Sequence, residues 1–377
     1  MHVLHAYKVF RPEIDGGIVS VMALACGAGG PDISSSILVA RGRFGLGRTY
    51  DFGPVKVRAV GSLGTYLGMP IAPGFPIALA MALRHVDVAA LHLPFPLNDI
   101  GIIGIPDRVG LVVHWHSEIY GRRLLVRALE PLMRRTLARA DRIIISNEAI
   151  VENSALLLPH RAKCEVVPFG VDARKWDLTD DRERAKADEL RRRYPRLIAA
   201  LGRLVPYKGF DVLLRALTEV DAHLIIIGTG AERKPLAKLA ASLGVSDRVT
   251  FTGYLSNEEV RIRLWAARVF AFPSATNAET FGISQLEAMA VGLPIVNTRL
   301  ATAVPRIARD GIEAVTVPPR DPQALAAALT RLLDDEPLAK RLGAAAQTRV
   351  RDEFEAARFV TRVHDIYREV YEAARTR

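Results

Sequence analysis

The chain has 377 residues and a formal net charge of +10, and half of its residues are hydrophobic. These are globular proportions and this length predicts two or three domains, so a disordered or fibrous protein is excluded. The two cysteines, Cys26 and Cys164, can form neither a disulfide framework nor a cysteine zinc site. The basic charge favours an anionic partner and leaves nucleic acid, anionic lipid and a phosphorylated small molecule open.

The sequence predicts neither a signal peptide nor a membrane span. Lys8, Arg11 and Glu13 stand where a signal peptide needs an apolar run. The most apolar stretch, residues 86–113, is broken by prolines and aspartates, whereas a spanning helix needs about 20 predominantly apolar residues. We therefore expect a cytoplasmic protein.

The first half of the chain alternates short apolar runs with longer amphipathic ones. Several of the short runs are too apolar to have a wet face, as expected for parallel strands that are covered on both sides. The alternation predicts a doubly wound α/β sheet. The expected strands are 3–7, 36–40, 55–60, 88–93, 111–115, 142–146 and 165–168, and the expected helices are 18–26, 76–84 and 124–139.

A highly charged segment without a strand, residues 172–196, interrupts this pattern and predicts a domain boundary. A second alternation follows, so the expected domains are residues 1–175 and 176–355. The last helix follows no strand, and we expect residues 356–377 to pack back on the first domain. The second set of expected strands is 197–202, 223–227, 249–252, 269–272, 295–297 and 314–317, with helices at 210–217, 235–243, 257–266, 284–291, 321–333 and 356–374.

Ligands of such sheets bind at the carboxyl ends of the strands, so the residues that follow each strand are the candidates. Gly16 and Gly17 precede a helix and could let backbone N–H groups approach an anion, although an ordinary tight loop fits equally well. Arg203 and Lys208 follow a strand of the second domain and suit a diphosphate. Solvated loop charges are the alternative for this pair.

Two carboxylates follow the strand at 269–272. Glu279 precedes a Gly-containing loop, and a carboxylate there can accept two sugar hydroxyls at once. Glu287 is expected on the first turn of the next helix, where the helix dipole alone would explain a carboxylate.

Three other chemistries fit less well. A dinucleotide site would need a third glycine where Arg233 stands, so Gly228 and Gly230 are expected to shape a loop beneath a ligand. His92, His114 and His116 lack the cysteine or helical histidine partners that would complete a metal site. A nucleic-acid-binding protein would need a basic stripe with aromatics, whereas this chain is 7% aromatic and its cations are scattered.

Together these features resemble the retaining family 4 glycosyltransferases of the GT-B fold. The resemblance rests on Glu279 and Glu287 in a Glu-x7-Glu pattern, the Arg203 and Lys208 pair, the Gly16-Gly17 loop, and His116. It implies two Rossmann-like domains that face each other across a cleft. Residues 5–8, 93–96 and 116–119 further resemble bacterial mannosyltransferases that build O-antigen and exopolysaccharide on polyprenyl diphosphate lipids.

The resemblance implies a hexose transfer, with mannose from GDP-mannose as the expected donor sugar and a lipid-linked or glycan acceptor. A UDP-sugar donor is the alternative; a nucleotide-sugar epimerase or hydrolase is disfavoured by the Glu-x7-Glu pattern. Such enzymes need no metal or other cofactor, because cations and helix ends carry the leaving-group charge. The implied catalytic residues are His116 and Glu279, the implied donor-binding residues Gly16, Gly17, Arg203, Lys208, Gly228, Phe281, Gly282, Ile283 and Glu287, and the implied acceptor-side residues Tyr7, Lys8, His92 and Phe95.

The first domain departs from the family pattern at Val19, at Glu118 and throughout residues 27–53, so the resemblance identifies the donor more closely than the acceptor. A lipid acceptor would bring this domain to the cytoplasmic face of a membrane. The arginine-rich segment around the expected helix 124–139, with Arg123, Arg127 and Arg134 nearly aligned at helical spacing, is a candidate for contact with anionic lipid, and a core-packed helix with a solvated basic face is the alternative.

Overall fold

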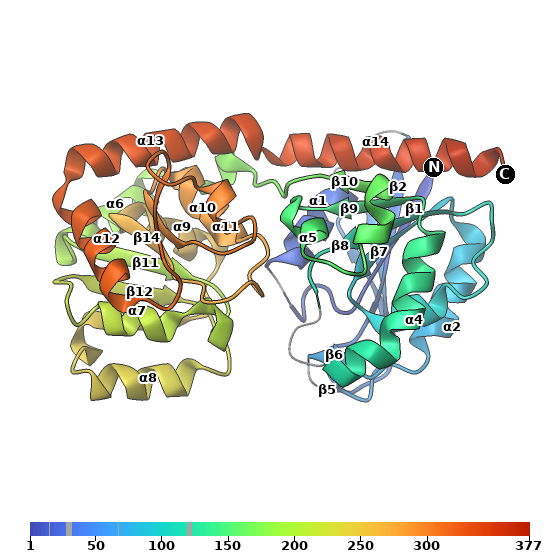
Figure 1. Ribbon diagram of the computed structural model, residues 1–377, viewed down its shortest axis with the longest axis horizontal. Helices are drawn as coiled ribbons and strands as arrows, with labels where there is room; N and C mark the ends of the chain where they lie inside the picture. Colours follow the sequence, from blue (N-terminus) through green and yellow to red (C-terminus); the bar gives the residue numbers. More distant parts are fainter. Residues whose placement is uncertain (15, 28–31, 67, 119–122) are drawn as a thin grey trace. The chain divides into compact units, whose positions relative to one another are not determined.

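The computed structural model describes residues 1–14, 16–27, 32–66, 68–118 and 123–377. It divides the chain into two compact units. The first unit combines residues 1–169 with the C-terminal residues 357–377, and the second contains residues 170–356. Each unit is a mainly parallel sheet with helices on both faces, as the ribbon shows (Figure 1).

The first sheet has eight strands in the order β10-β9-β8-β7-β1-β2-β4-β3. β3 pairs antiparallel with β4, and the other pairs are parallel. The order reverses between β1 and β7, because β2 lies on one side of β1 and β8 on the far side of β7. The strands are β1 (His2–Tyr7), β2 (Ser34–Ala40), β3 (Arg48–Phe52), β4 (Val55–Val60), β7 (Val88–Leu93), β8 (Gly110–Trp115), β9 (Arg142–Ile145) and β10 (Cys164–Val166).

Alternating side chains of the buried strand β1 pack into the cores on the two faces of this sheet. Leu4 and Ala6 belong to the core under α2 (Phe75–Ala82), α3 (Pro96–Gly101) and α4 (Arg123–Arg139). Tyr7 belongs to the core under α1 (Ile18–Gly27).

The last helix, α14 (Ala356–Arg375), packs on the α1 side of the first unit. Tyr367 forms a hydrogen bond with His114 at 2.7 Å, and His364 bonds to the carbonyl oxygen of Ala25 at 2.9 Å. The amphipathic pattern of this helix therefore matches a buried face on the first sheet, far from it in sequence.

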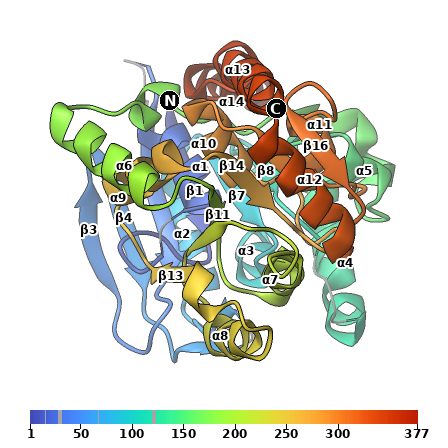
Figure 2. The ribbon, with the colours of Figure 1, turned by 90° about the vertical axis from the view of Figure 1, so that its left-hand side faces the viewer.

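The second sheet has six strands in the order β13-β12-β11-β14-β15-β16, all paired in parallel. Figure 2 faces this unit and shows α7 and α12 on one side of the strands and α6 and α9 on the other. The strands are β11 (Leu197–Leu201), β12 (His223–Ile227), β13 (Val249–Gly253), β14 (Val269–Phe272), β15 (Ile295–Thr298) and β16 (Ala314–Val317). The helices are α6 (Asp181–Arg193), α7 (Phe210–Ala216), α8 (Arg233–Ser242), α9 (Asn257–Ala266), α10 (Ile283–Val291), α12 (Pro322–Asp334) and α13 (Glu336–Glu353).

The charged segment that predicted a boundary contains a helix of the second unit. Asp180 caps α6 by accepting a hydrogen bond from the backbone N–H of Glu183, and Glu183 forms a buried ion pair with Arg261 of α9. The arginine side-chain hydrogen bonds hold the pKa of Glu183 down at about 2. The structure places the change between units at residues 169 and 170, ahead of the charged segment.

Two short hairpin strands, β5 (Thr65–Tyr66) and β6 (Met69–Pro70), extend from the first unit beside the end of β4. Across the described residues, no helix combines the length and apolar character that crossing a bilayer requires.

Candidate active site

Two of the predicted residues of the second unit, Lys208 and Glu279, meet where its strand order reverses, between β11 and β14. The sheet continues through β12 on one side and through β15 on the other, which is where open α/β sheets bind ligands. Lys208 follows β11 and Glu279 follows β14. Their side chains form an ion pair, with 2.5 Å between Lys208 Nζ and Glu279 Oε2, and they are only 12% and 10% exposed.

A second layer of side chains orients this ion pair. The hydroxyl of Ser274 donates to Glu279 Oε2 at 3.0 Å, and the Thr298 hydroxyl donates to the backbone oxygen of Ser274 at 2.6 Å. Lys208 Nζ also lies 5.0 Å from the centre of the Phe272 ring. Ser274 and Thr298 were not predicted from the sequence, because their contacts with each other and with Glu279 form only when β15 pairs with β14.

Glycines let the loops after β11, β12 and β14 approach one another closely. Gly209 has φ +68°, and a Cβ there would lie 2.0 Å from the carbonyl oxygen of Pro273. A Cβ on Gly228 would lie 2.0 Å from the oxygen of Gly202, and one on Gly230 would lie 2.2 Å from the oxygen of Leu204. These positions admit no larger residue without moving backbone.

The helix after Glu279 begins one residue earlier than the sequence predicted. Gly282 precedes it with φ +94°, and α10 starts at Ile283, so Glu287 is its fifth residue. The expectation that Glu287 lies on the first turn was therefore wrong. Because the helix-dipole effect falls off within the first turn, it does not account for a carboxylate at this position.

The remaining donor-side predictions fall into two groups. Phe281 is buried and Gly282 and Ile283 form the N-terminus of α10, where helix N–H groups lack intrahelical partners. Arg203 is exposed on the loop after β11. In this structure the ammonium group that reaches Glu279 is that of Lys208.

In the first unit, the predicted residues lie at the carboxyl ends of β1 and β8 and before α1. Gly16 and Gly17 have φ values of +84° and +53° at the start of α1. Tyr7 ends β1, Lys8 follows it, and His116 follows β8. The ring centres of Tyr7 and His116 are 6.2 Å apart.

Two acceptor-side predictions are corrected by burial. His92 is 0% exposed on β7 and Phe95 is 1% exposed, with its ring 5.0 Å from that of Phe75 in the core. Neither side chain reaches the surface, so neither is retained as a direct acceptor contact. Burial also lowers the pKa of His92 and of His116 well below 6.5, so both imidazoles are neutral at pH 7.

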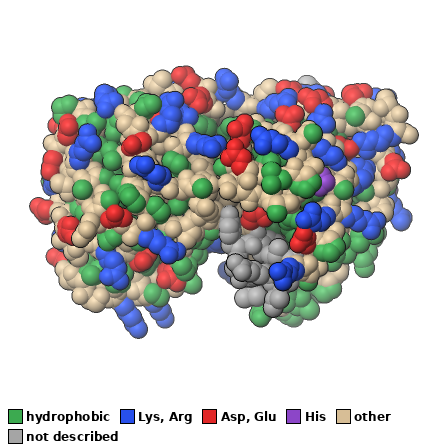
Figure 3. Space-filling view, viewed as in Figure 1, with side chains coloured by type: hydrophobic (Ala, Val, Ile, Leu, Met, Phe, Trp, Pro, Cys, Tyr) green, Lys and Arg blue, Asp and Glu red, His purple; other side chains and the backbone are tan. Residues whose placement is uncertain are grey.

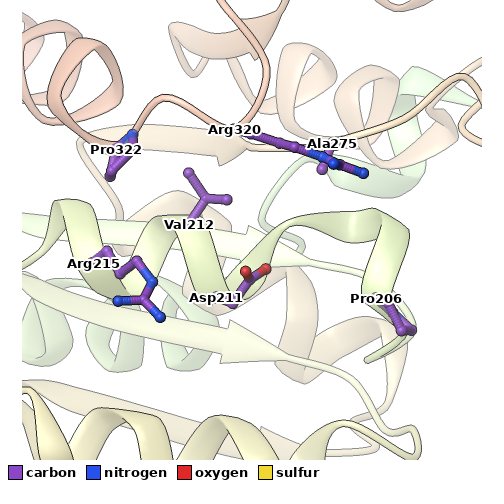
Figure 4. Close-up of a pocket in the computed structure, with 7 residues that line it drawn as sticks. All are labelled: Pro206, Asp211, Val212, Arg215, Ala275, Arg320 and Pro322. Atoms are coloured by element: carbon purple, nitrogen blue, oxygen red, sulfur yellow. The ribbon is translucent and has the colours of Figure 1, made fainter.

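The second unit also has an open cavity of about 310 Å³ next to the loops after β11 and β14 (Figure 4). Pro206 and Ala275 come from those loops, and α7 contributes Asp211 and Arg215. Arg320, exposed and at φ +62°, approaches from the segment before α12. This cavity was not predicted from the sequence, and neither Lys208 nor Glu279 is among the residues that line it.

No group of three or more histidine, cysteine, aspartate or glutamate side chains in the described part of the chain is arranged to hold a metal ion.

Comparison with known families assigns both halves of the chain. Residues 16–175 match the model described as Glycosyltransferase Family 4, and residues 181–349 match the one described as Glycosyl transferases group 1. The chain is a GT-B glycosyltransferase. The two matches fall on the two structural units in turn, which confirms the predicted fold class.

Relatives and solved structures that match the glycosyltransferase along nearly its whole length support this assignment. The O-antigen chain mannosyltransferase C of Escherichia coli is 28% identical over 99% of this chain and 100% of its own length. The D-rhamnosyltransferase WbpZ of Pseudomonas aeruginosa is 29% identical over 94% of this chain and 93% of its own. The structure of sucrose-phosphate synthase from Thermosynechococcus elongatus superposes with a TM-score of 0.81 at 20% identity, covering 99% of both chains, and supports the fold.

Proposed function

We propose that this glycosyltransferase moves a hexose, mannose from GDP-mannose, onto a lipid-linked or glycan acceptor during bacterial cell-surface polysaccharide synthesis, with retention of anomeric configuration. The observation that carries the proposal is the end-to-end similarity to an O-antigen mannosyltransferase and a D-rhamnosyltransferase. The Lys208–Glu279 pair at the strand-order reversal supplies the chemistry that such a donor needs.

In this proposal, different residues bind the diphosphate, the transferred sugar and the ribose of the donor. Lys208 and Arg203 neutralise the diphosphate, together with the backbone N–H groups at the start of α10 and at Gly17. Glu279 accepts hydroxyls of the transferred sugar, Glu287 accepts those of the ribose, and His116 contacts the sugar. In the structure, Lys208 and Glu279 are paired with each other. The arriving diphosphate replaces Glu279 as a partner of Lys208 and frees the carboxylate for the sugar.

In this mechanism the charge that develops on the leaving diphosphate is stabilised by preorganised cations and helix ends. The acceptor attacks the face from which the diphosphate departs, and a phosphate oxygen takes its proton. No side chain is assigned as general base, and no metal ion is assigned to the donor site.

GDP-mannose is preferred as donor because several partial relatives carry it in their names. The GDP-mannose-dependent phosphatidylinositol monomannoside mannosyltransferase of Mycobacterium tuberculosis is 37% identical over 49% of this chain and 50% of its own length. A UDP-sugar remains the competing donor. A solved structure with UDP, HepE of Anabaena, has a TM-score of 0.75, but at 18% identity it bears on the fold alone.

The deciding experiment is a screen of the purified protein against GDP- and UDP-sugars, read by melting shift and by release of the nucleoside diphosphate. We expect the largest shift and fastest release with GDP-mannose, unchanged in excess EDTA. A response to UDP-sugars alone would replace the donor. Loss of turnover on chelation that Mg²⁺ or Mn²⁺ restores would overturn the metal-free mechanism.

A lipid acceptor requires the first unit to approach a membrane, and this unit has an exposed apolar face. The face consists of Phe44, Leu46, Leu63, Tyr66, Ile71, Ile77, Met81, Ile100 and Ile103, which are 42–88% exposed. Its segments are neighbours: residues 45 and 62 form a β-bridge, Leu63 bonds to the oxygen of Ile71 at 2.8 Å, and α2 packs against α3. Large apolar side chains exposed on neighbouring segments are typical of an interaction site.

Basic side chains adjoin this apolar face. Arg43 lies within its first loop, Arg84 follows α2, and Arg127 and Arg135 are exposed on α4, which packs against α3. Figure 3 shows hydrophobic and basic side chains together where Figure 1 draws α2 and α4. Apolar contact combined with cations is the chemistry of an interfacial site on anionic lipid. We assign this apolar face to the membrane surface that holds the acceptor.

A further inference from the structure

Three buried imidazoles on neighbouring strands form a hydrogen-bonded row that ends at His116. His5 Nδ1 of β1 lies 3.1 Å from His92 Nε2 of β7, and His92 Nδ1 lies 2.9 Å from His116 Nε2. The three residues are 0%, 0% and 5% exposed. The row therefore runs from the interior of the first unit to the carboxyl end of β8, where the proposed sugar contact lies.

The imidazoles in this row are neutral. Burial is the largest cause that lowers the pKa of His5, His92 and His116, and nearby His114 lowers each further. Lys8, at the end of β1, also lowers the pKa of His116. A neutral imidazole has one N–H and one bare nitrogen, so the row can be protonated in only two ways. Every ring carries its proton on Nδ1, or every ring carries it on Nε2.

The far end of the row distinguishes the two arrangements. His5 Nε2 is buried and has no hydrogen-bond partner among the described residues. With protons on Nε2, this atom would be an orphaned buried N–H, which native structures rarely contain. With protons on Nδ1, it is a bare nitrogen, and both hydrogen bonds of the row point toward His116.

We propose that His5 and His92 are positioning residues that fix His116 as its Nδ1–H tautomer, so that His116 acts as a hydrogen-bond donor to its ligand. The bare Nε2 of His116 is occupied by the N–H of His92, which leaves the Nδ1–H as the only donor of the ring. Sugar hydroxyl and phosphate oxygens both accept from such a donor. The identity of this ligand rests on the proposed function, whereas the tautomer does not.

The same geometry argues against a proton relay. A relay needs a partner for the proton at each end, and at His5 Nε2 the described residues provide none. The row therefore holds one arrangement of protons instead of passing a proton through the sheet. Fixing a ring in this way is a common means of setting which nitrogen of a histidine faces its ligand.

The test is a two-bond ¹H–¹⁵N correlation spectrum of the ligand-free protein labelled with ¹⁵N-histidine, with His116→Gln used to assign the His116 signals. We expect His5, His92 and His116 to be protonated at Nδ1 and bare at Nε2, without titration between pH 6 and pH 8. A His116 that is protonated at Nε2, or cationic in this range, would overturn the proposal.

Variants of His92 separate positioning from packing. In His92→Asn the amide N–H₂ stands near the former Nδ1–H, so His116 should keep its tautomer. In His92→Leu the His116 ring should populate both tautomers, with donor turnover lower by roughly fivefold to tenfold for one lost hydrogen bond. The control is His364→Leu, a buried histidine of α14 that bonds to Ala25 instead.

An unchanged His116 tautomer in His92→Leu, or an equal change in His364→Leu, would refute the positioning role. If His92→Leu does not fold, the tautomer of His116 in the wild-type spectrum still tests the proposal. The spectra need no donor, so they test the tautomer independently of the proposed function. If the tautomers are as expected but the protein transfers no hexose, the proposed function is refuted and the positioning role of His5 and His92 is not.

Discussion

Lys208 and Glu279 balance each other's charge at a site that water barely reaches. A paired, desolvated charge becomes costly when its partner is removed, because the remaining charge has neither water nor a counterion. At 12% and 10% exposure the two side chains are close to this limit without reaching it. The pair therefore links donor binding to local stability, and substitutions in it affect both.

We expect Lys208→Ala and Glu279→Ala each to lower transfer about 10²–10³-fold, the usual cost of losing one stabiliser of developing charge. Each should also lower the free energy of unfolding by about 1–3 kcal/mol, below the 3–5 kcal/mol typical of a fully buried pair. The double variant should lose less than the sum. The measurements are initial rates and urea unfolding of the three variants.

The control for this cycle is Lys340→Ala with Glu336→Ala, an ion pair on α13 whose side chains are 76% and 53% exposed. Its effect on rate and stability should be small, because exposed ion pairs contribute little. Near-wild-type turnover by either single variant at the donor site would contradict the assignment. Additive stability losses there would show that the two charges do not interact.

Gly209 provides a second test at the level of one residue. Gly209 and Gly244 have almost the same φ, +68° and +70°. A Cβ at Gly209 would lie 2.0 Å from the oxygen of Pro273, whereas one at Gly244 would meet no described atom within 4 Å. Both Gly→Ala variants bear the strain of a positive φ, about 1–3 kcal/mol, but only Gly209→Ala forces two loops apart.

We therefore expect Gly209→Ala to weaken donor binding by about tenfold or more, on the scale of one lost charged contact, and Gly244→Ala to leave it unchanged. Calorimetric titration with the nucleoside diphosphate measures this difference directly, and thermal melts check that both variants are folded. Equal binding by the two variants would mean that the close approach of the loops does not shape the donor site.

At the level of elements, the sequence predicted the helices and strands whose own local hydrophobic pattern indicates that they are buried. Strands such as β7 and β14 are continuous apolar runs, and their positions were predicted to the residue. α6 was missed because its strong charge resembles a linker, whereas the buried Glu183–Arg261 ion pair joins it to α9. β3 was missed because it is a half-exposed edge strand that only β4 defines.

The candidate site was predicted as single residues and not as contacts. Lys208 and Glu279 were identified after their strands, but their ion pair follows from the order β11-β14, which no local spacing reveals. The histidine row likewise depends on the register of β1, β7 and β8. His92 pairs with His114 in the register of β7 and β8, and its side chain is fully buried.

The contact between α3 and α4 predicts a pH dependence of stability. Asp99 of α3 is 2% exposed and accepts a hydrogen bond from the Thr136 hydroxyl of α4 at 2.5 Å. Burial is the main cause that raises its pKa from 3.8 to about 6. The folded protein therefore binds more protons than the unfolded chain between these values. This stabilising contribution is complete below pH 3.8 and is lost as the pH rises through 6.

We expect Asp99→Asn, which cannot ionise, to be more stable than the parent at pH 8 by up to about 2–3 kcal/mol, with the difference shrinking toward pH 4. Chemical unfolding of both proteins across this pH range measures the difference. The control is Asp51→Asn, on the exposed edge strand β3. An advantage of Asp99→Asn that does not vary with pH would show that Asp99 does not titrate in this range.

At the level of the whole molecule, the charge of +10 and the exposed apolar face act in the same direction. In the proposed membrane contact, long-range attraction would bring the protein to an anionic surface, and apolar side chains would then insert at the interface. Salt weakens the first contribution, because the Debye length is about 8 Å at physiological ionic strength. The second contribution does not require charge, so the two can be separated by experiment.

The wild-type protein should sediment with anionic vesicles and not with neutral ones, and moderate salt should release it. Arg127→Gln with Arg135→Gln removes two exposed cations of α4 and should weaken binding by about 2 kcal/mol, or roughly 30-fold.

The apolar face is tested separately: Leu46→Ser with Ile77→Ser should weaken the part of vesicle binding that persists in salt. The matched control is Tyr254→Ser, an apolar side chain 74% exposed on the second unit, which should bind as wild type. Donor release should be unchanged in the arginine double variant and in Leu46→Ser with Ile77→Ser, because none of these four residues is assigned to the donor site. If wild type binds neutral vesicles equally well, or if Tyr254→Ser weakens binding as much as Leu46→Ser with Ile77→Ser does, the apolar face is not the membrane contact. The transferase would then reach a lipid acceptor through another surface, or act on a glycan free of the membrane.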